Sequence, residues 1–266
     1  MRKIAANYIF PVCAAPIKNG VVVLDDTNTI VEIIDNDGVL VEAEKTEFYN
    51  GVLVPGFTFF YRINDDLVQA GKLPEIDRVL YHNGIAALGC QTNIKNAFLP
   101  PTKLQVKYQM VTDKELEEKV NVYISGKNIL LSDTDFSAQR VEQLKERLPD
   151  FETKLVVFNE RIPEFKNDLL KAMKAENEAL LSFFVPGIIS TLNPMLFMKN
   201  LFLLQMTGVS FEKILQWITL NGAVTMQLSE TFGSFEKGKS PGIVLIENFD
   251  FQKTGLRLNS KIRRLI

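Results

Sequence analysis

Short runs of apolar residues separated by turn-forming residues open the chain. They predict strands over residues 7–12, 20–24 and 30–34, with turns at 25–28 and 35–38. The last segment, residues 233–266, returns to the same pattern of strands and turns. Because the two ends are alike in kind, we expect them to pair as one small β-sandwich.

The middle of the chain has a different pattern, in which apolar strands alternate with helical periodicity. Strands are predicted over residues 52–60, 85–88, 104–111, 121–125, 129–131 and 155–158. Helices are predicted over residues 137–147, 164–180, 193–206 and 210–227. This alternation is typical of an α/β layer or barrel. We therefore predict two domains: a composite β-sandwich from residues 1–50 and 234–266, and an α/β domain over residues 51–233.

Composition and charge exclude several classes of protein. The 266 residues are 46% hydrophobic and 23% charged, which suits a folded chain with a sizeable core. Thirty Lys and Arg against thirty-two Asp and Glu give a net charge of −2, so there is no basic surface for nucleic acid. No apolar run reaches about 18 residues, and the apolar stretch at 8–15 is too short for a signal peptide. We expect a soluble, cytoplasmic protein with no membrane partner.

The counts of cysteine and histidine limit the chemistry further. Cys13 and Cys90 are too few for a disulfide framework or a cysteine-based zinc site. His82 is the single histidine, whereas hydrolytic zinc sites and Ser-His or Cys-His catalysis all draw on this residue type. Because His82 precedes Asn83 and Gly84, we favour a place at the end of a helix, where a cation or donor is stabilised.

Three segments together resemble the amidohydrolase superfamily. The pattern at its entry to the barrel is similar to residues 20–26 (GVVVLDD) with 49–57 (YNGVLVPGF). Its closing helix and return to the sandwich are similar to residues 215–223 (LQWITLNGA) with 233–246 (GSFEKGKSPGIVLI). Residues 77–89 (DRVLYHNGIAALG) are similar to the cytosine-deaminase-like branch. The resemblance implies a distorted (β/α)8 TIM-like barrel with metal ligands at the carboxyl ends of strands.

The same resemblance implies that the metal positions of the family are degenerate in this chain. The histidines of the His-x-His pair align with Tyr61 and Ile63, and two further histidines align with Asp133 and Phe158. The catalytic aspartate aligns with Ile189. In relatives these positions activate water on a divalent metal. Since no cluster of N and O donors survives for zinc or iron, we expect no metal and no other cofactor.

The α/β domain is also shorter than the about 250 residues of a typical complete barrel, so we expect a shortened barrel.

The sequence allows two roles for each of several side chains. Asp133 and Asp135 fit a general acid and base, or, as we favour, a turn and cap before Ser137. Cys90 fits a nucleophile, or more simply a small buried hydrophobe.

Phenylalanines are concentrated on the strands and the helix predicted to line the former site. They are Phe57, Phe59, Phe60, Phe183, Phe184, Phe197 and Phe202, accompanied by Tyr61. We favour the interpretation that they refill a cavity emptied of metal and water. The alternative is an apolar pocket or interface, in which the helix over 192–206 docks on another subunit.

The sequence therefore predicts a non-catalytic amidohydrolase-like protein that serves as an interaction partner or small-molecule binder. The partner is a second copy or a related amidohydrolase-type subunit. A small molecule would bind at the barrel mouth, lined by Tyr61, Asn64, Gln91, Asn93 and Asp133. The alternative is a hydrolase of carbon–nitrogen bonds with relocated, metal-independent residues around Tyr61, Asp133 and Gln91.

Overall fold

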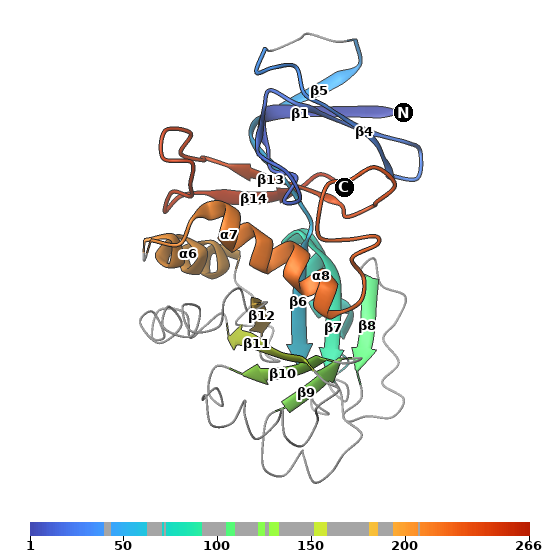
Figure 1. Cartoon of the computed structure of the whole chain (residues 1–266), viewed down its shortest axis with the longest axis vertical. Coiled ribbons are helices and arrows are strands. Elements are labelled where there is room, and N and C mark those ends of the chain that lie inside the picture. Colours follow the sequence, from blue (N-terminus) through green and yellow to red (C-terminus); the bar gives the residue numbers. More distant parts are fainter. Residues whose placement is uncertain are drawn as a thin grey trace.

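A computed structural model of the chain contains two seven-stranded sheets and a layer of helices (Figure 1). The structure describes residues 1–39, 44–62, 71, 73–91, 105–109, 122–125, 128–132, 152–158, 181–185, 194–206 and 208–266. Only the backbone is described for residues 60–62, 73, 76, 90–91 and 194–196 and for the strands between 105 and 185. The predicted helices over 137–147 and 164–180 lie outside the described residues.

The first sheet combines strands from both ends of the chain. Its strands are β1 (Arg2–Ile9), β2 (Ile17–Lys18), β3 (Val21–Leu24), β4 (Ile30–Ile34), β5 (Thr46–Pro55), β13 (Ile243–Glu247) and β14 (Lys261–Arg264). Their order is β14-β13-β5-β1-β3-β4, with β2 paired to β1. The blue and red strands accordingly lie together at one end of the molecule (Figure 1). The two ends of the chain thus share one sheet, while the domain boundaries stay a prediction.

The first strand begins earlier than its pattern predicts. We expected a strand over 7–12, but β1 spans Arg2–Ile9. The charged residues Arg2 and Lys3 conceal its start in the hydrophobic pattern, although both pair with β3. Pro11 follows the strand, and Val12 has a φ of +75°, so the chain turns there.

The second sheet contains the strands of the α/β segment. They are β6 (Phe57–Arg62), β7 (Ile85–Gln91), β8 (Gln105–Gln109), β9 (Val122–Ser125), β10 (Asn128–Ser132), β11 (Glu152–Phe158) and β12 (Leu181–Val185). Their order is β8-β7-β6-β12-β11-β10-β9. All neighbours are parallel except β9 and β10. The end strands β8 and β9 contact each other, which is the arrangement a closing barrel needs.

A single glycine connects the two sheets and corrects one predicted strand. Residues 52–60 read as one continuous strand, but β5 ends at Pro55 and β6 begins at Phe57. Gly56 lies between them and donates its backbone N–H to the carbonyl of Gly242 (3.3 Å). A Cβ at this position would lie 2.5 Å from both the Ala86 Cβ and the Pro241 carbonyl oxygen. Only glycine permits this approach of the two sheets.

Arg264 forms a second connection between the sheets. Its Nη1 donates to the carbonyl of Ile85 at the start of β7, and its guanidinium lies 3.9 Å from the ring centroid of Tyr81. Tyr81 belongs to α2 (Leu73–His82), the helix between β6 and β7. Burial lowers the pKa of Arg264. A largely buried cation therefore joins the edge strand β14 to the strand and helix of the second sheet.

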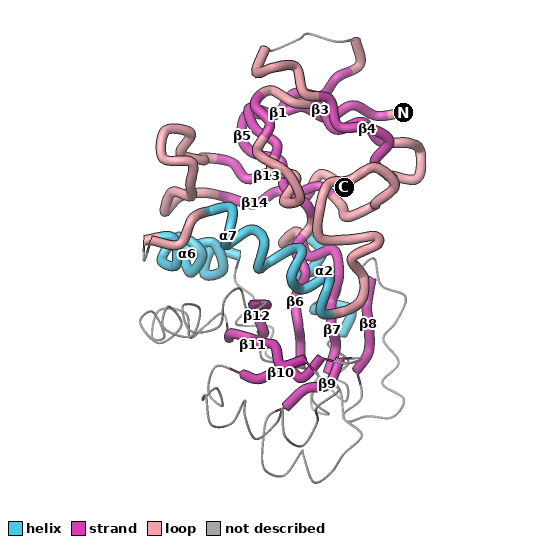
Figure 2. Tube along the Cα trace, in the orientation of Figure 1, coloured by secondary structure: helices cyan, strands magenta, loops and turns pink. Residues whose placement is uncertain are grey.

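The helices of the C-terminal half lie between the two sheets (Figures 1 and 2). They are α6 (Pro194–Gln205) and a continuous rod made of α7 (Phe211–Gln216), the π-helical turn η3 (Trp217–Asn221) and α8 (Gly222–Thr225). Ser210 caps the rod by accepting a hydrogen bond from the Lys213 N–H. η3 packs against β6 and β12, and the buried Thr58 hydroxyl donates to the Thr219 carbonyl (2.6 Å). The rod therefore fixes the position of β6.

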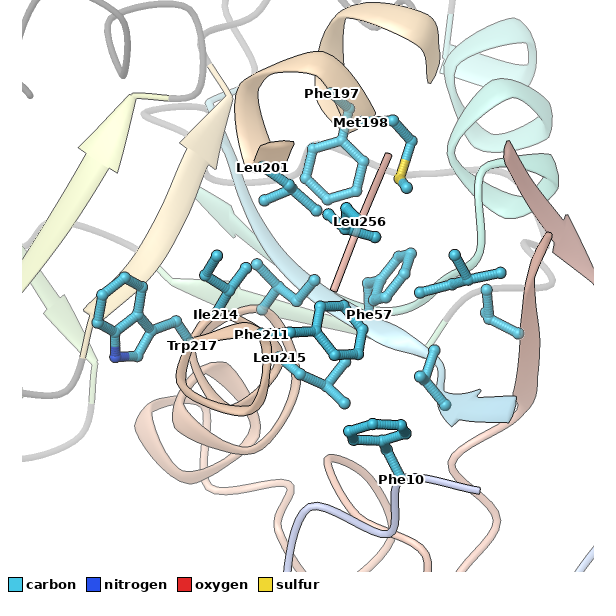
Figure 3. Packing of buried hydrophobic residues seen from close by; sticks show 14 of the residues in the cluster. Phe10, Phe57, Phe197, Met198, Leu201, Phe211, Ile214, Leu215, Trp217 and Leu256 are labelled. Atoms are coloured by element: carbon cyan, nitrogen blue, oxygen red, sulfur yellow. The ribbon is translucent and has the colours of Figure 1, made fainter. Parts of the chain in front are cut away.

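Phenylalanines from a strand and a helix form the centre of the larger core. Phe197 of α6 packs edge-on against Phe59 and Phe57, with ring centroids 5.0 and 5.6 Å apart. Trp217 and Leu201 belong to the same cluster (Figure 3). One face of α6 thus packs on its own chain, while docking of this helix on another subunit stays a prediction. Four of its hydrophobic side chains are buried within this chain: Phe197, Met198, Leu201 and Leu204.

A surface cluster on the first sheet controls the ionisation of one carboxylate. Arg2 donates two hydrogen bonds to Glu47, at 2.6 and 2.8 Å, and the Tyr49 hydroxyl donates a third at 2.7 Å. These bonds, the one from Arg2 most of all, lower the pKa of Glu47 from 4.5 to about 2.

Because Glu47 has a lower pKa in the folded chain than in the unfolded one, it stabilises the fold above about pH 4.5. This contribution is lost as the pH falls toward 2. In Glu47→Gln we expect the fall in unfolding free energy between pH 6 and pH 3 to be smaller than in the wild type. The difference should stay below about 1 kcal/mol because both partners are partly exposed. Urea unfolding at both pH values measures it. Tyr49→Phe keeps the arginine pair and should retain most of the wild-type pH dependence, whereas an unchanged dependence in Glu47→Gln would contradict the assignment.

Candidate functional site

The carboxyl ends of the parallel strands are the natural place for a site in this fold. The arrowheads of β6 and β7 point away from the sheet formed by the two chain ends (Figure 1). The rod of α7, η3 and α8 packs on β6 by way of Thr58, three residues before Tyr61. Strand alternation therefore places position 61 on the opposite face of β6 from Thr58.

Strand register places several polar residues together at the carboxyl ends of β6, β7 and β8. Tyr61 of β6 pairs with Cys90 of β7, and Cys90 pairs with Tyr108 of β8. At the next register position Gln91 pairs with Arg62 on one side and with Gln109 on the other. Two phenols, a thiol, two carboxamides and a guanidinium thus occupy the last two register positions of three neighbouring strands.

The register brings together only some of the predicted site residues. Tyr61 and Gln91 lie at the ends of adjacent strands, but they are one register position apart, so strand alternation places them on opposite faces of the sheet. Phe158 ends β11 and pairs with Phe184 of β12, which pairs with Phe60 of β6. Phe158 is therefore two strands away from Tyr61. The remaining predicted positions lie outside the described residues: Ile63, Asn64, Asn93, Asp133 and Ile189.

Tyr108 is a site position that the sequence analysis missed. It lies in β8, within the predicted strand over 104–111, at the same register level as Tyr61 and Cys90. The available signal was a tyrosine in the second half of a predicted barrel strand. Tyr108 comes level with Tyr61 and Cys90 only because β8 pairs with β7, and the hydrophobic pattern within one segment does not predict which strands pair.

The single histidine lies at the opposite end of β7. His82 is exposed in the last turn of α2, and its ring meets the Tyr81 ring edge-on at 5.9 Å. Gly84 follows with a φ of +80°, and its carbonyl accepts a hydrogen bond from the Phe57 N–H (2.8 Å). His82 thus has the helix-end position that its sequence predicts. The length of β7 separates it by about 20 Å from the strand's carboxyl end.

The residues at the strand ends do not fit a histidine-ligated metal. Catalytic zinc sites take several ligands from histidine, cysteine or carboxylate side chains. Within the part of the chain that the structure describes, no three such side chains form a group able to hold a metal ion. The chain has one histidine, His82, which lies in the last turn of α2, near the start of β7 and not near its carboxyl end.

A buried serine and a partly buried lysine elsewhere also fail to form a catalytic pair. Ser234 accepts a hydrogen bond from Lys239 Nζ (2.9 Å), and Glu236 bonds to both. The hydrogen bond from Lys239, more than any other contact, lowers the pKa of Glu236. Since Lys239 donates to both neighbours and Ser234 is completely buried, this cluster stabilises the turn before β13.

Comparison with known proteins defines the family. A model described as "Amidohydrolase family" matches residues 107–262, which is more than half of the chain and extends from β8 to β14. This chain belongs to the amidohydrolase family. No curated protein sequence is significantly similar to it.

Solved structures of amidohydrolases share the fold at low sequence identity. Helicobacter pylori aminofutalosine deaminase, in complex with methylthio-coformycin, has a TM-score of 0.64 and 13% identity over the full length of both chains. A zinc-bound adenosine deaminase from Xanthomonas campestris has a TM-score of 0.60 and 11% identity, covering 95% of this chain and 85% of the other. Ochratoxinase from A. niger has a TM-score of 0.60 and 10% identity, covering 95% and 90%. At these identities the likeness shows the fold alone.

These findings confirm the family resemblance and the mixed α/β fold. The cytosine-deaminase-like branch, the degeneracy of the metal positions and barrel closure stay predictions. Within the described residues, no helix is long and apolar enough to cross a membrane.

Proposed function

We propose that this chain is a hydrolase of small molecules that acts on carbon–nitrogen bonds other than peptide bonds. The family match over residues 107–262 carries the proposal, because it covers the end of β8 and the strands β9 to β12, which form one sheet with β6 and β7. It favours this function over the non-catalytic interpretation of the sequence. The proposal includes a shortened (β/α) barrel of the cytosine-deaminase-like branch and a cytoplasmic location.

The proposed reaction uses residues at the strand ends. Water adds to the carbon of the substrate's C–N bond, that bond breaks, and the departing nitrogen takes a proton. Asp133 is the proposed general base for water, and Tyr61 the proposed donor to the developing negative charge. Gln91 is the last residue of β7, and its carboxamide is proposed to contact the substrate beyond the end of that strand.

The test is release of ammonia or amine from a panel of amides, ureas and amino-substituted heterocycles. We expect turnover of at least one member, and Tyr61→Phe should lower kcat by about 10²-fold or more. His82→Gln is the matched control and should leave kcat unchanged, because His82 is exposed at the other end of β7. Turnover that survives Tyr61→Phe undiminished would contradict the proposed role of this residue.

A second candidate function is non-catalytic association with another copy or with a related amidohydrolase-type subunit. The packing of Phe57 and Phe59 against Phe197 favours it, since aromatic rings fill the interior near the start of β6. This candidate predicts no turnover and no saturable binding across the substrate panel. It also predicts concentration-dependent association in sedimentation equilibrium.

A further inference from the structure

We infer that the site at the carboxyl ends of β6, β7 and β8 works without the divalent metal ion that a histidine-ligated amidohydrolase centre would hold. The inference rests on the proposed function only for the location of the site. It concerns what the residues at that location are able to bind, which is measurable whether or not the substrate is known.

The single imidazole of the chain lies far from these strand ends. Any histidine-based centre in this chain must use His82. The turn that carries it is held at the start of β7, because Asn83 Nδ2 donates to the Val79 carbonyl (2.7 Å) and Gly84 bonds to both Tyr81 and Phe57. Bringing His82 to the carboxyl end would require unfolding α2 and breaking its connection to β6.

The residue types at the strand ends are also poor in metal ligands. Tyr61, Cys90 and Tyr108 share one register level, and Gln91 and Gln109 share the next. Cysteine, histidine and carboxylate are the side chains that bind zinc in proteins, and of these the two levels contain one thiol. One thiol does not replace three or four ligands. Phenols and carboxamides instead donate and accept hydrogen bonds, which suits a neutral polar substrate.

The consequence for the reaction is that water must be activated by a protein side chain. A metal ion would lower the pKa of bound water and polarise the reacting carbon. Without one, both tasks fall to general acid–base groups and hydrogen-bond donors, and Tyr61 is the candidate at the end of β6. Carboxylates such as Asp133 and Asp135 would by themselves suit magnesium or manganese, so the experiment includes a metal of that class.

The experiment measures metal in the full chain purified without chelators, for the wild type and for His82→Gln. Elemental mass spectrometry gives zinc, iron and manganese per chain, and calorimetric titrations with Zn²⁺ and Mn²⁺ test binding. We expect less than about a tenth of an equivalent in both proteins, and no rise in Tm on adding either ion, because a ligand that binds only the folded state would raise it.

Each outcome decides the inference. Zinc that is lost in His82→Gln is held at the end of α2 and leaves the inference standing. About one equivalent of any metal retained by His82→Gln places that metal on other donors and overturns it. A metal-free protein that turns over no substrate contradicts the proposed function but not this inference. If His82→Gln both retains the metal and turns over substrate, this inference is overturned and the proposed function is left intact.

Discussion

Replacing Gly56 with alanine is expected to lower the free energy of unfolding by roughly 3 kcal/mol or more. The added Cβ would lie 2.5 Å from the Ala86 Cβ and 2.5 Å from the Pro241 carbonyl oxygen. Neither neighbour is the flexible end of a side chain, so the backbone itself must move. That movement would separate β6 from the sheet of the two chain ends at the only residue between β5 and β6. Urea unfolding of both proteins measures the difference.

Gly238→Ala separates this steric effect from the general cost of replacing a glycine. Gly238 has a φ of +89° and open space around its Cβ position, so alanine there should cost only about 1 kcal/mol. Gly56 has no positive φ, and its whole cost is therefore steric. Equal losses in the two variants would show that the sheets do not approach as closely at Gly56 as the structure has them.

The same glycine shows where sequence patterns stop being informative. Residues 52–60 are almost all apolar because residues 52–59 are buried, and burial gives no sign that the pairing partner changes. The strand at 30–34 was predicted with its observed bounds, because the turn at 25–28 and the polar residues 35–38 delimit it. Turn-forming residues thus predict where a strand ends, but they do not predict where the chain passes from one sheet to another.

Less of the candidate site than of the fold was predicted, because the site also depends on which strands pair. Tyr61 and Gln91 were found by resemblance and by their place at predicted strand ends, and the register of β6 and β7 places them at the ends of adjacent strands but on opposite faces of the sheet. Tyr108 was missed because its relation to Cys90 depends on long-range pairing. His82 was placed correctly because Asn83 and Gly84 are local signals for a helix end.

Replacing Phe197 with alanine should lower the free energy of unfolding by about 3 to 4 kcal/mol. The Phe197 ring is 5% exposed and contacts the rings of Phe57 and Phe59 edge-on. Alanine would therefore remove apolar contact area, two aromatic pairs and the filling of a space that neighbouring backbone cannot close. Phe197→Leu keeps most of the volume and should cost about 1.5 kcal/mol or less. Thermal and urea unfolding of the three proteins give these values.

This variant also decides between the two interpretations of α6. If the helix packs on its own chain, Phe197→Ala lowers stability and does not alter self-association measured by sedimentation equilibrium. Met206, just after α6 and 62% exposed, is the matched control, and Met206→Ala should change stability by less than about 0.5 kcal/mol. The opposite result would be a Phe197→Ala variant with the urea midpoint of the wild type but with weaker self-association. The helix would then be an interface between copies of the chain. The intramolecular packing that makes α6 part of this core would then be wrong.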